Sequence, residues 1–124
     1  MAHDIAFLIV HLMGGFWKYR QYYLRKRDSR SGMSGIIGRI YYLYQERYGA
    51  FIGHTATFAS VPCFPHNLFG VFVAGGVRIG RNCVIFQHVT IGANSLPDSQ
   101  TVGVPTIGDN VYIGAGAKII GSVS

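Results

Sequence analysis

Histidine is the residue in this chain whose side chain most readily does chemistry near neutral pH, because its imidazole gains and loses a proton there. Three of the five histidines lie in the C-terminal part of the chain: His54, His66 and His88. An imidazole can also bind a metal ion, but these three form no His-x-x-x-x-His pair, and Cys63 and Cys83 form no CxxC pair. Metal sites commonly use such close pairs of ligands, so the spacing predicts no metal site. The two cysteines are interpreted instead as small buried residues.

The element that must position these histidines is a repeat of six residues. Aliphatic residues recur in constant phase, and glycine directly follows four of them. The repeating residues are Val73, Ile79, Ile85, Ile91, Ile107, Ile113 and Ile119. Six is the period of a triangular solenoid, in which each hexapeptide forms one short strand and one turn. We expect the aliphatic residues to point inward and stack three hexapeptides apart, with glycine and asparagine forming corners at 80–82 and 108–110.

Two breaks in the phase of the repeat locate irregular backbone. Ile91 and Ile107 are 16 residues apart, which is not a multiple of six, so a loop of about ten residues is expected at 95–105. A smaller break, of three residues, falls at 65–70 and contains His66. Ligand sites concentrate where a rigid scaffold holds irregular backbone, so both breaks are candidate ligand sites.

The N-terminal part has a different composition. Residues 1–50 contain eight of the eleven Lys and Arg residues and seven of the eight tyrosines, and they carry +5 of the formal net charge of +6. The remaining residues are nearly neutral and rich in Gly, Val and Ile. We therefore expect a basic, Tyr-rich helical leader at 1–49 and a repeat domain at 50–124. The leader contains no nucleic-acid-binding motif, so nucleic acid is not an expected partner.

Two segments of the leader have helical patterns. The apolar run at 5–13 is too short to span a membrane, which takes about 20 residues. It is interpreted as a short helix that packs on a neighbour, with a membrane interface beside the basic residues at 18–30 as the alternative position. Apolar residues at 34–48 also recur with helical spacing, and Ser34 is expected to cap the helix that they predict. Gly49 is expected to be the left-handed residue just past its end.

Two blocks of the repeat domain resemble the serine acetyltransferase group of the hexapeptide-repeat acyltransferases. They read PHNLFGVFVAGGVRIGRNCVIFQHVTIG at 65–92 and PTIGDNVYIGAGAKIIGSVS at 105–124. The His-x-x-x-Gly element, VTIG and IGAGAKI occur together and in order, which is more specific than the repeat alone. The resemblance implies a mainly β fold, a left-handed parallel β-helix preceded by a short α-helical leader.

The resemblance also implies an activity, that of a cytoplasmic, trimeric O-acetyltransferase that uses acetyl-CoA at crevices between subunits. His66 matches the catalytic histidine of the group, which removes the proton of the acceptor hydroxyl as that hydroxyl attacks the thioester, without an acyl-enzyme. A neutral imidazole suits this role near pH 7. The residues expected to contact coenzyme A are Gly92, Ala93, Gly114, Ala115, Gly116 and Lys118, and those expected near the acceptor are His88 and His54.

Three positions depart from the serine-specific pattern of that group. Phe51 stands where an aspartate orients the catalytic histidine, and Pro65 stands where an acidic residue usually precedes it. Val104 lies where a second histidine and an arginine are usual. The acceptor is therefore L-serine or, alternatively, a sugar or glycan hydroxyl, in which case the basic leader would hold the chain near membrane-linked substrate. A third alternative is a non-catalytic β-helix that acts as a structural or partner-binding module.

The repeat is still in phase where the sequence stops, at Ser124. A solenoid that ends there exposes an apolar face, which repeat proteins normally cap. Members of the group typically continue with further coils. We therefore expect either a shortened member of the group or an open end that another subunit covers.

Overall fold

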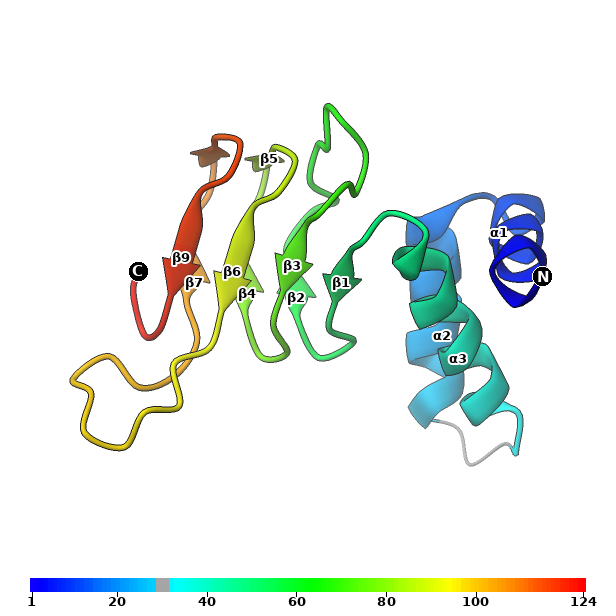
Figure 1. The fold of residues 1–124 in the computed structure, drawn as a ribbon, viewed down its shortest axis with the longest axis horizontal. Helices are drawn as coiled ribbons and strands as arrows, with labels where there is room; N and C mark the ends of the chain where they lie inside the picture. The colour runs from blue at the N-terminus through cyan, green and yellow to red at the C-terminus, as the bar shows by residue number, and fades with distance from the viewer. Residues whose placement is uncertain (29–31) are drawn as a thin grey trace. The chain divides into compact units, whose positions relative to one another are not determined.

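The computed structural model describes residues 1–28 and 32–124, which form two compact units (Figure 1). The helical unit comprises Met1–Tyr48 and the strand unit comprises Gly49–Ser124. The helices are α1 (Ala2–Leu12), α2 (Phe16–Asp28) and α3 (Ser34–Glu46). Gly14 and Gly15 separate α1 from α2 with φ of 96° and 99°, a conformation that side chains with a Cβ rarely adopt.

Aromatic rings form the core of the helical unit, where α1 and α2 both pack against α3. Tyr41 of α3 is fully buried, with the ring of Phe16 at 5.4 Å and that of Tyr23 at 5.2 Å between centroids. The buried Tyr19 hydroxyl donates a hydrogen bond of 2.9 Å to the carbonyl of Ile37. These phenols thus supply both ring packing and satisfied polar atoms in one small core.

Helix α3 differs in detail from its sequence-based expectation. Ser34 does not cap it, because the helix already begins at Ser34 and its cap residue is Met33. It ends at Glu46, and Gly49 does take the expected left-handed conformation, with φ of 61°. Ile36, one of the apolar residues of the helical pattern at 34–48, is 61% exposed, whereas the polar Gln45 is fully buried. Gln45 is accommodated because its Nε2 donates to the carbonyl of Tyr41.

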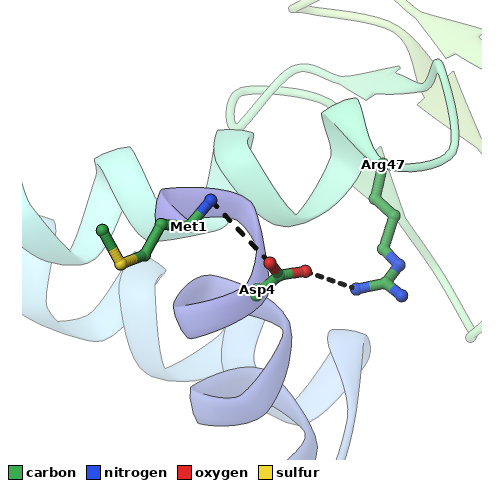
Figure 2. A network of polar contacts seen from close by, with 3 residues as sticks. All are labelled: Met1, Asp4 and Arg47. Carbon is green, nitrogen blue, oxygen red and sulfur yellow. Dashed lines mark ion pairs between the residues drawn. The ribbon is translucent and has the colours of Figure 1, made fainter.

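Ionic and cation–π contacts join the start of α1 to the end of α3. Figure 2 shows the Asp4 carboxylate between the terminal ammonium of Met1, at 3.8 Å, and the Arg47 guanidinium, at 3.6 Å. The same guanidinium lies 4.2 Å from the centre of the Phe7 ring, and His3 bonds to Glu46 at 2.6 Å. The helix predicted from the apolar run at 5–13 therefore packs on a neighbouring helix, as expected.

The opposite side of α1 carries an apolar stripe that remains exposed. Its residues are Met1, Ile5, Leu8 and Leu12, between 54% and 93% exposed. They are three or four positions apart and so lie on one side of the helix, away from the buried Ala6 and Val10. No helix within the described residues is long and apolar enough to cross a bilayer.

The strand unit consists of nine short strands in three parallel sheets. The strands are β1 (Phe51–Ile52), β2 (Thr57–Phe58), β3 (Phe72–Val73), β4 (Arg78–Ile79), β5 (Val84–Ile85), β6 (Thr90–Gly92), β7 (Thr106–Ile107), β8 (Tyr112–Ile113) and β9 (Lys118–Ile120). Sheet A is β1-β3-β6-β9, sheet B is β2-β4-β7 and sheet C is β5-β8. From β3 onward the chain visits A, B and C in strict rotation, and Figure 1 shows the strands of sheet A side by side.

The expected stacking of the repeat is confirmed by the register of these sheets. Ile52 pairs with Val73, Val73 with Ile91, and Ile91 with Ile119. The first three of these side chains are fully buried. Consecutive strands of sheet A are 21, 18 and 28 residues apart, because Phe72 follows Phe51, Thr90 follows Phe72, and Lys118 follows Thr90. Both predicted breaks are thus real, since three and ten residues are added to the regular 18.

The corners confirm some expectations and correct others. Asparagine rather than glycine takes the left-handed conformation at two of them, with φ of 56° at Asn82 and 60° at Asn110. Cys83 is buried as expected, but Cys63 is exposed, because it precedes an inward position and its side chain faces outward.

The chain is mixed helix and strand, rather than mainly β as the sequence had predicted. Its three helices of 11, 13 and 13 residues outweigh strands of two or three residues, because most of each hexapeptide forms corners.

The helical unit is expected to lose stability at alkaline pH. Burial, with smaller contributions from Tyr22 and Tyr23, raises the pKa of Tyr19 from its ordinary 10 to about 12. Between these values the unfolded chain releases the Tyr19 proton and the folded chain keeps it, so stability present below pH 10 declines as the pH rises toward 12. Urea unfolding followed by helical circular dichroism from pH 8 upward measures this decline. Tyr19→Phe should show a shallower decline, and an identical slope in both proteins would contradict the assignment.

Candidate functional site

Three corners that join sheet C to sheet A lie in one column, which we call the histidine edge. They are the turn at 65–70, the segment 86–88 between β5 and β6, and the segment 114–116 between β8 and β9. The backbone N–H of His88 donates to the carbonyl of Phe69 at 2.9 Å, and that of Gly116 donates to the carbonyl of Gln87 at 3.1 Å. These hydrogen bonds continue the parallel ladder through the corners and hold the three segments one above another.

His66 is displayed on the longest of these corners. The turn is closed by hydrogen bonds from Asn67 N–H to the Phe64 carbonyl, at 3.1 Å, and from Val71 N–H to the Leu68 carbonyl, at 3.0 Å. Leu68 is buried and anchors the turn, while His66 is exposed. The fold therefore presents the imidazole to solvent on irregular backbone that a rigid scaffold holds at both ends.

Aromatic rings flank His66 on the outside of sheet C. Its ring lies 5.9 Å from that of Phe86, and Phe86 lies 4.9 Å from Tyr112, which is 67% exposed. We call the rings of His66, Phe86 and Tyr112 the aromatic row. Sequence reasoning missed Phe86 and Tyr112, although each directly adjoins an inward isoleucine and strand alternation turns its side chain outward.

The histidine edge carries no fixed charge. None of the residues at 65–70, 86–88 and 112–116 is Asp, Glu, Lys or Arg. Within the part of the chain that the structure describes, no side-chain hydrogen bond orients the His66 ring, and the Oε1 atom of Gln87 is buried without a partner. Phe51, which replaces the orienting aspartate of the resembled group, instead stacks on Phe72 at 5.1 Å on the outer face of sheet A.

The structure brings only some of the predicted site residues together. His66, His88, Gly114, Ala115 and Gly116 share the histidine edge. Lys118 is exposed at the start of β9 and pairs with Thr90 on sheet A.

The remaining candidates lie at a different corner of the triangle, where the chain crosses from sheet A to sheet B. His54 follows β1 there, Gly92 is the last residue of β6, and Ala93 follows it. Gly92 is buried, and a Cβ on it would come within 2.9 Å of Ile120 Cδ1. The absence of a side chain at Gly92 therefore serves packing between β6 and β9.

The predicted loop leaves the strand unit at this second corner and comprises residues 93–105 (Figure 1). Asn94 and Gly103 exchange backbone hydrogen bonds of 2.8 and 2.9 Å at its base. Inside the loop, Asn94 Nδ2 donates to Ser99 Oγ at 2.7 Å and to Thr101 Oγ1 at 3.1 Å, while its Oδ1 accepts from the N–H of Leu96. The loop is thus an ordered excursion organised by one amide side chain.

The strand unit also contains a cavity away from the histidine edge. It has a volume of about 220 Å³ and lies among residues of the last coil, and Ile107, Val111, Ile119 and Val123 line it. Across residues 1–28 and 32–124, no three His, Cys, Asp or Glu side chains gather as metal ligands would.

Comparisons with known proteins identify relatives of this chain. The sequence is 42% identical over 55 residues to a serine acetyltransferase of Staphylococcus xylosus and 35% identical over 54 residues to one of Synechococcus elongatus. The structure is similar to that of the serine acetyltransferase isoform 3 of Entamoeba histolytica, solved in complex with cysteine, with a TM-score of 0.65 and 26% identity.

The chain is similar to serine acetyltransferases. The resemblance predicted from the two sequence blocks is thereby confirmed. The sequence matches cover 44% of this chain but only 24% and 21% of the two relatives, so the chain spans about a quarter of their length. The structural match covers 86% of this chain and 36% of the Entamoeba protein. No family model matches the sequence.

Removing the Asn94 side chain is expected to loosen the loop without unfolding the sheets. Asn94→Ala deletes three hydrogen bonds, each worth about 0.5–1.5 kcal/mol, so amides within 93–105 should exchange with solvent at least about tenfold faster. Peptide-level hydrogen exchange measures this change.

Ser95→Ala is the matched control, because it shortens the neighbouring side chain without removing these bonds. Equal exchange rates in the two variants would contradict the role of Asn94.

Proposed function

We propose that this chain is an acetyl-CoA-dependent O-acetyltransferase in which His66 is the general base. The observation that carries the proposal is the combination of the similarity to serine acetyltransferases with an exposed imidazole on the fixed turn at 65–70. Acetyl-CoA is a co-substrate, and the proposed chemistry needs no metal.

The proposed reaction is a direct transfer. The imidazole of His66 takes the proton of the acceptor hydroxyl as that oxygen attacks the thioester carbonyl. The tetrahedral intermediate then collapses, the C–S bond breaks, and the proton passes to the departing thiolate to give free coenzyme A. Backbone N–H groups at the corners are the proposed donors to the developing oxyanion.

We propose that coenzyme A lies along the part of the histidine edge formed by residues 114–116. Gly114, Ala115 and Gly116 leave open backbone there, since a Cβ on either glycine would meet nothing within 4 Å. The exposed Lys118 ammonium can attract a phosphate. Gly92 and Ala93 would reach the same coenzyme only from another subunit, which is consistent with a site between subunits.

The finer architecture belongs to the same proposal. Strict rotation of the chain among three parallel sheets supports a left-handed parallel β-helix, and the TM-score of 0.65 with a serine acetyltransferase supports the same architecture. We propose residues 50–124 as the acyltransferase domain, 1–49 as its helical leader, a homotrimer as the assembly and the cytoplasm as the location.

L-serine is the proposed acceptor, because serine acetyltransferases are the proteins that this chain resembles. One observation favours the alternative of a sugar hydroxyl. Serine carries an ammonium and a carboxylate, which need charged partners, and the histidine edge has none within its own chain. The aromatic row offers instead an apolar surface on which the C–H face of a sugar ring can rest.

The glycan alternative also draws on the helical unit. An exposed apolar stripe on α1, in a segment of net charge +5, is the combination that binds peripherally to anionic membranes. Such binding would hold the chain near membrane-linked acceptors, and co-sedimentation with anionic and neutral vesicles is the measurement that tests it.

Thiol release from acetyl-CoA distinguishes the alternatives when serine and a panel of sugars are offered in turn. Release with serine alone supports the serine acceptor, and release with a sugar alone supports the glycan acceptor. For a sugar, Tyr112→Ala should raise its KM about tenfold and leave the KM of acetyl-CoA unchanged, because the ring stacks only on the acceptor. No release with any acceptor would overturn the enzymatic proposal and favour a binding module.

Replacing the proposed base should abolish most of the transfer while preserving the fold. We expect His66→Ala to lower kcat by about 10²-fold or more, the usual contribution of a general base. His66 is exposed and its ring lies 5.9 Å from that of Phe86, so circular dichroism and the melting temperature should change little. His11→Ala, which removes an exposed imidazole from α1, is the control. Near-normal turnover in His66→Ala would remove His66 from the mechanism.

A further inference from the structure

At the histidine edge, each of the three stacked coils has a left-handed residue at the same corner position. The register that pairs Phe72 with Thr90 and Thr90 with Lys118 puts Gly70, His88 and Gly116 at equivalent positions, two residues before each strand. Their φ angles are 67°, 59° and 73°. Glycine adopts this conformation without cost, whereas a residue with a Cβ adopts it reluctantly. The middle coil thus carries an imidazole where its neighbours carry no side chain.

His88 is unusual even among residues that share this conformation. In the described parts of the chain, the other non-glycine residues with positive φ are Asn67, Asn82 and Asn110. Asparagine tolerates the left-handed region because its short amide can bond locally. The imidazole of His88 is a larger side chain at a position where the fold favours glycine.

The imidazole of His88 leans toward the turn that carries His66. A Cβ on Gly70 would overlap the His88 ring, whereas a Cβ on Gly116 would meet nothing within 4 Å. The backbone N–H of the same residue donates to the Phe69 carbonyl at 2.9 Å. Two separate groups of His88 therefore hold the last two residues of the turn at 65–70.

This turn needs such support more than a regular corner does. It is three residues longer than the corner between β5 and β6, and its regular ladder resumes only at Phe72. Between the bridge at Cys63 and the start of β3, the anchors of this segment include the buried Leu68 and Val71, the hydrogen bond from Phe51 N–H to the Val71 carbonyl, and the contacts from His88. Small displacements of a catalytic group lower a rate steeply, so rigidity at this turn matters for transfer.

We propose that His88 is a positioning residue whose imidazole braces the turn at 65–70 and thereby holds His66 in place. This role rests on the proposed function of His66, and it replaces direct contact with the acceptor, the role that the sequence suggested for His88. The proposal explains why a ring persists at a left-handed corner and why residue 70 must be glycine. It predicts that stability and activity respond in opposite directions to loss of the ring.

The decisive variant is His88→Gly, which gives the middle coil the same residue as its neighbours. The melting temperature should stay the same or rise, because glycine relieves the left-handed backbone. We expect kcat to fall about tenfold and the KM of acetyl-CoA to stay within twofold. A residue that only supported the fold would lower stability and activity together.

Asn110→Gly is the matched control. It makes the same backbone change at a left-handed corner between sheets B and C, away from the histidine edge. We expect no change in kcat for this variant. A loss equal to that of His88→Gly would show a general effect of corner glycines and would overturn the proposal.

Steric coupling between residues 70 and 88 gives a second test. Gly70→Ala introduces a Cβ into the space of the His88 ring, so it should lower kcat in the wild-type background and lower it less in the His88→Gly background. Equal effects in the two backgrounds would overturn the proposed contact. A readout independent of turnover is the His66 Cε1–H resonance, which should be single and sharp in the wild type and broadened in His88→Gly.

The outcomes separate this inference from the function on which it rests. A wild-type chain that transfers acetyl groups, with His88→Gly equally active and its His66 resonance unchanged, overturns the role of His88 alone. A wild-type chain that releases no thiol with any acceptor overturns the proposed function, and the role of His88 with it.

Discussion

Vertical stacking of inward aliphatic side chains is the constraint on which the strand unit depends. Ile52, Val73 and Ile91 occupy one column with no exposed surface, and parallel backbone bonds fix the register between them. A slip of one residue would turn every inward side chain outward. Extra residues can therefore enter only at corners, and the chain must return from each insertion to the same register. Both insertions obey this rule, since Val73 and Ile119 regain the column after them.

This constraint also explains how much the sequence could predict. The six-residue phase gave the inward residues, the two insertions and their lengths, because each follows from counting between aliphatic residues. Counting did not reveal which candidates share an edge. His54 and His66 are twelve residues apart, which is two full repeats. His54 nevertheless lies at the corner between sheets A and B, and His66 lies at the corner between sheets C and A. Each corner of the triangle recurs every three hexapeptides, so residues that are two hexapeptides apart lie at different corners.

The helical unit was harder to predict because its core is specified by individual contacts rather than by a repeat. The burial of Gln45 depends on a bond to the Tyr41 carbonyl, and Ile36 is exposed although it fits an apolar helical pattern. The stretch containing α2 is basic, yet Arg20 within it is buried and its Nε donates to the Tyr41 hydroxyl at 3.2 Å. Hydrogen bonds between polar and aromatic side chains leave little periodic signal, so such burial is seen only in three dimensions.

The histidine edge shows how a repeat can display reactive side chains at small cost to its fold. Outward positions are free of the stacking constraint, so Phe86, just after β5, and Tyr112, in β8, form an aromatic surface without disturbing any column. The corners from β3 to β6 and from β7 to β9 are less free, because each of them contains a left-handed residue where the chain turns. A side chain at such a position opposes the backbone preference, and it is retained only where its contacts compensate. The most informative residues of this unit are therefore the left-handed corner residues that are not glycine. His88, beside the turn of His66, has the largest side chain among them.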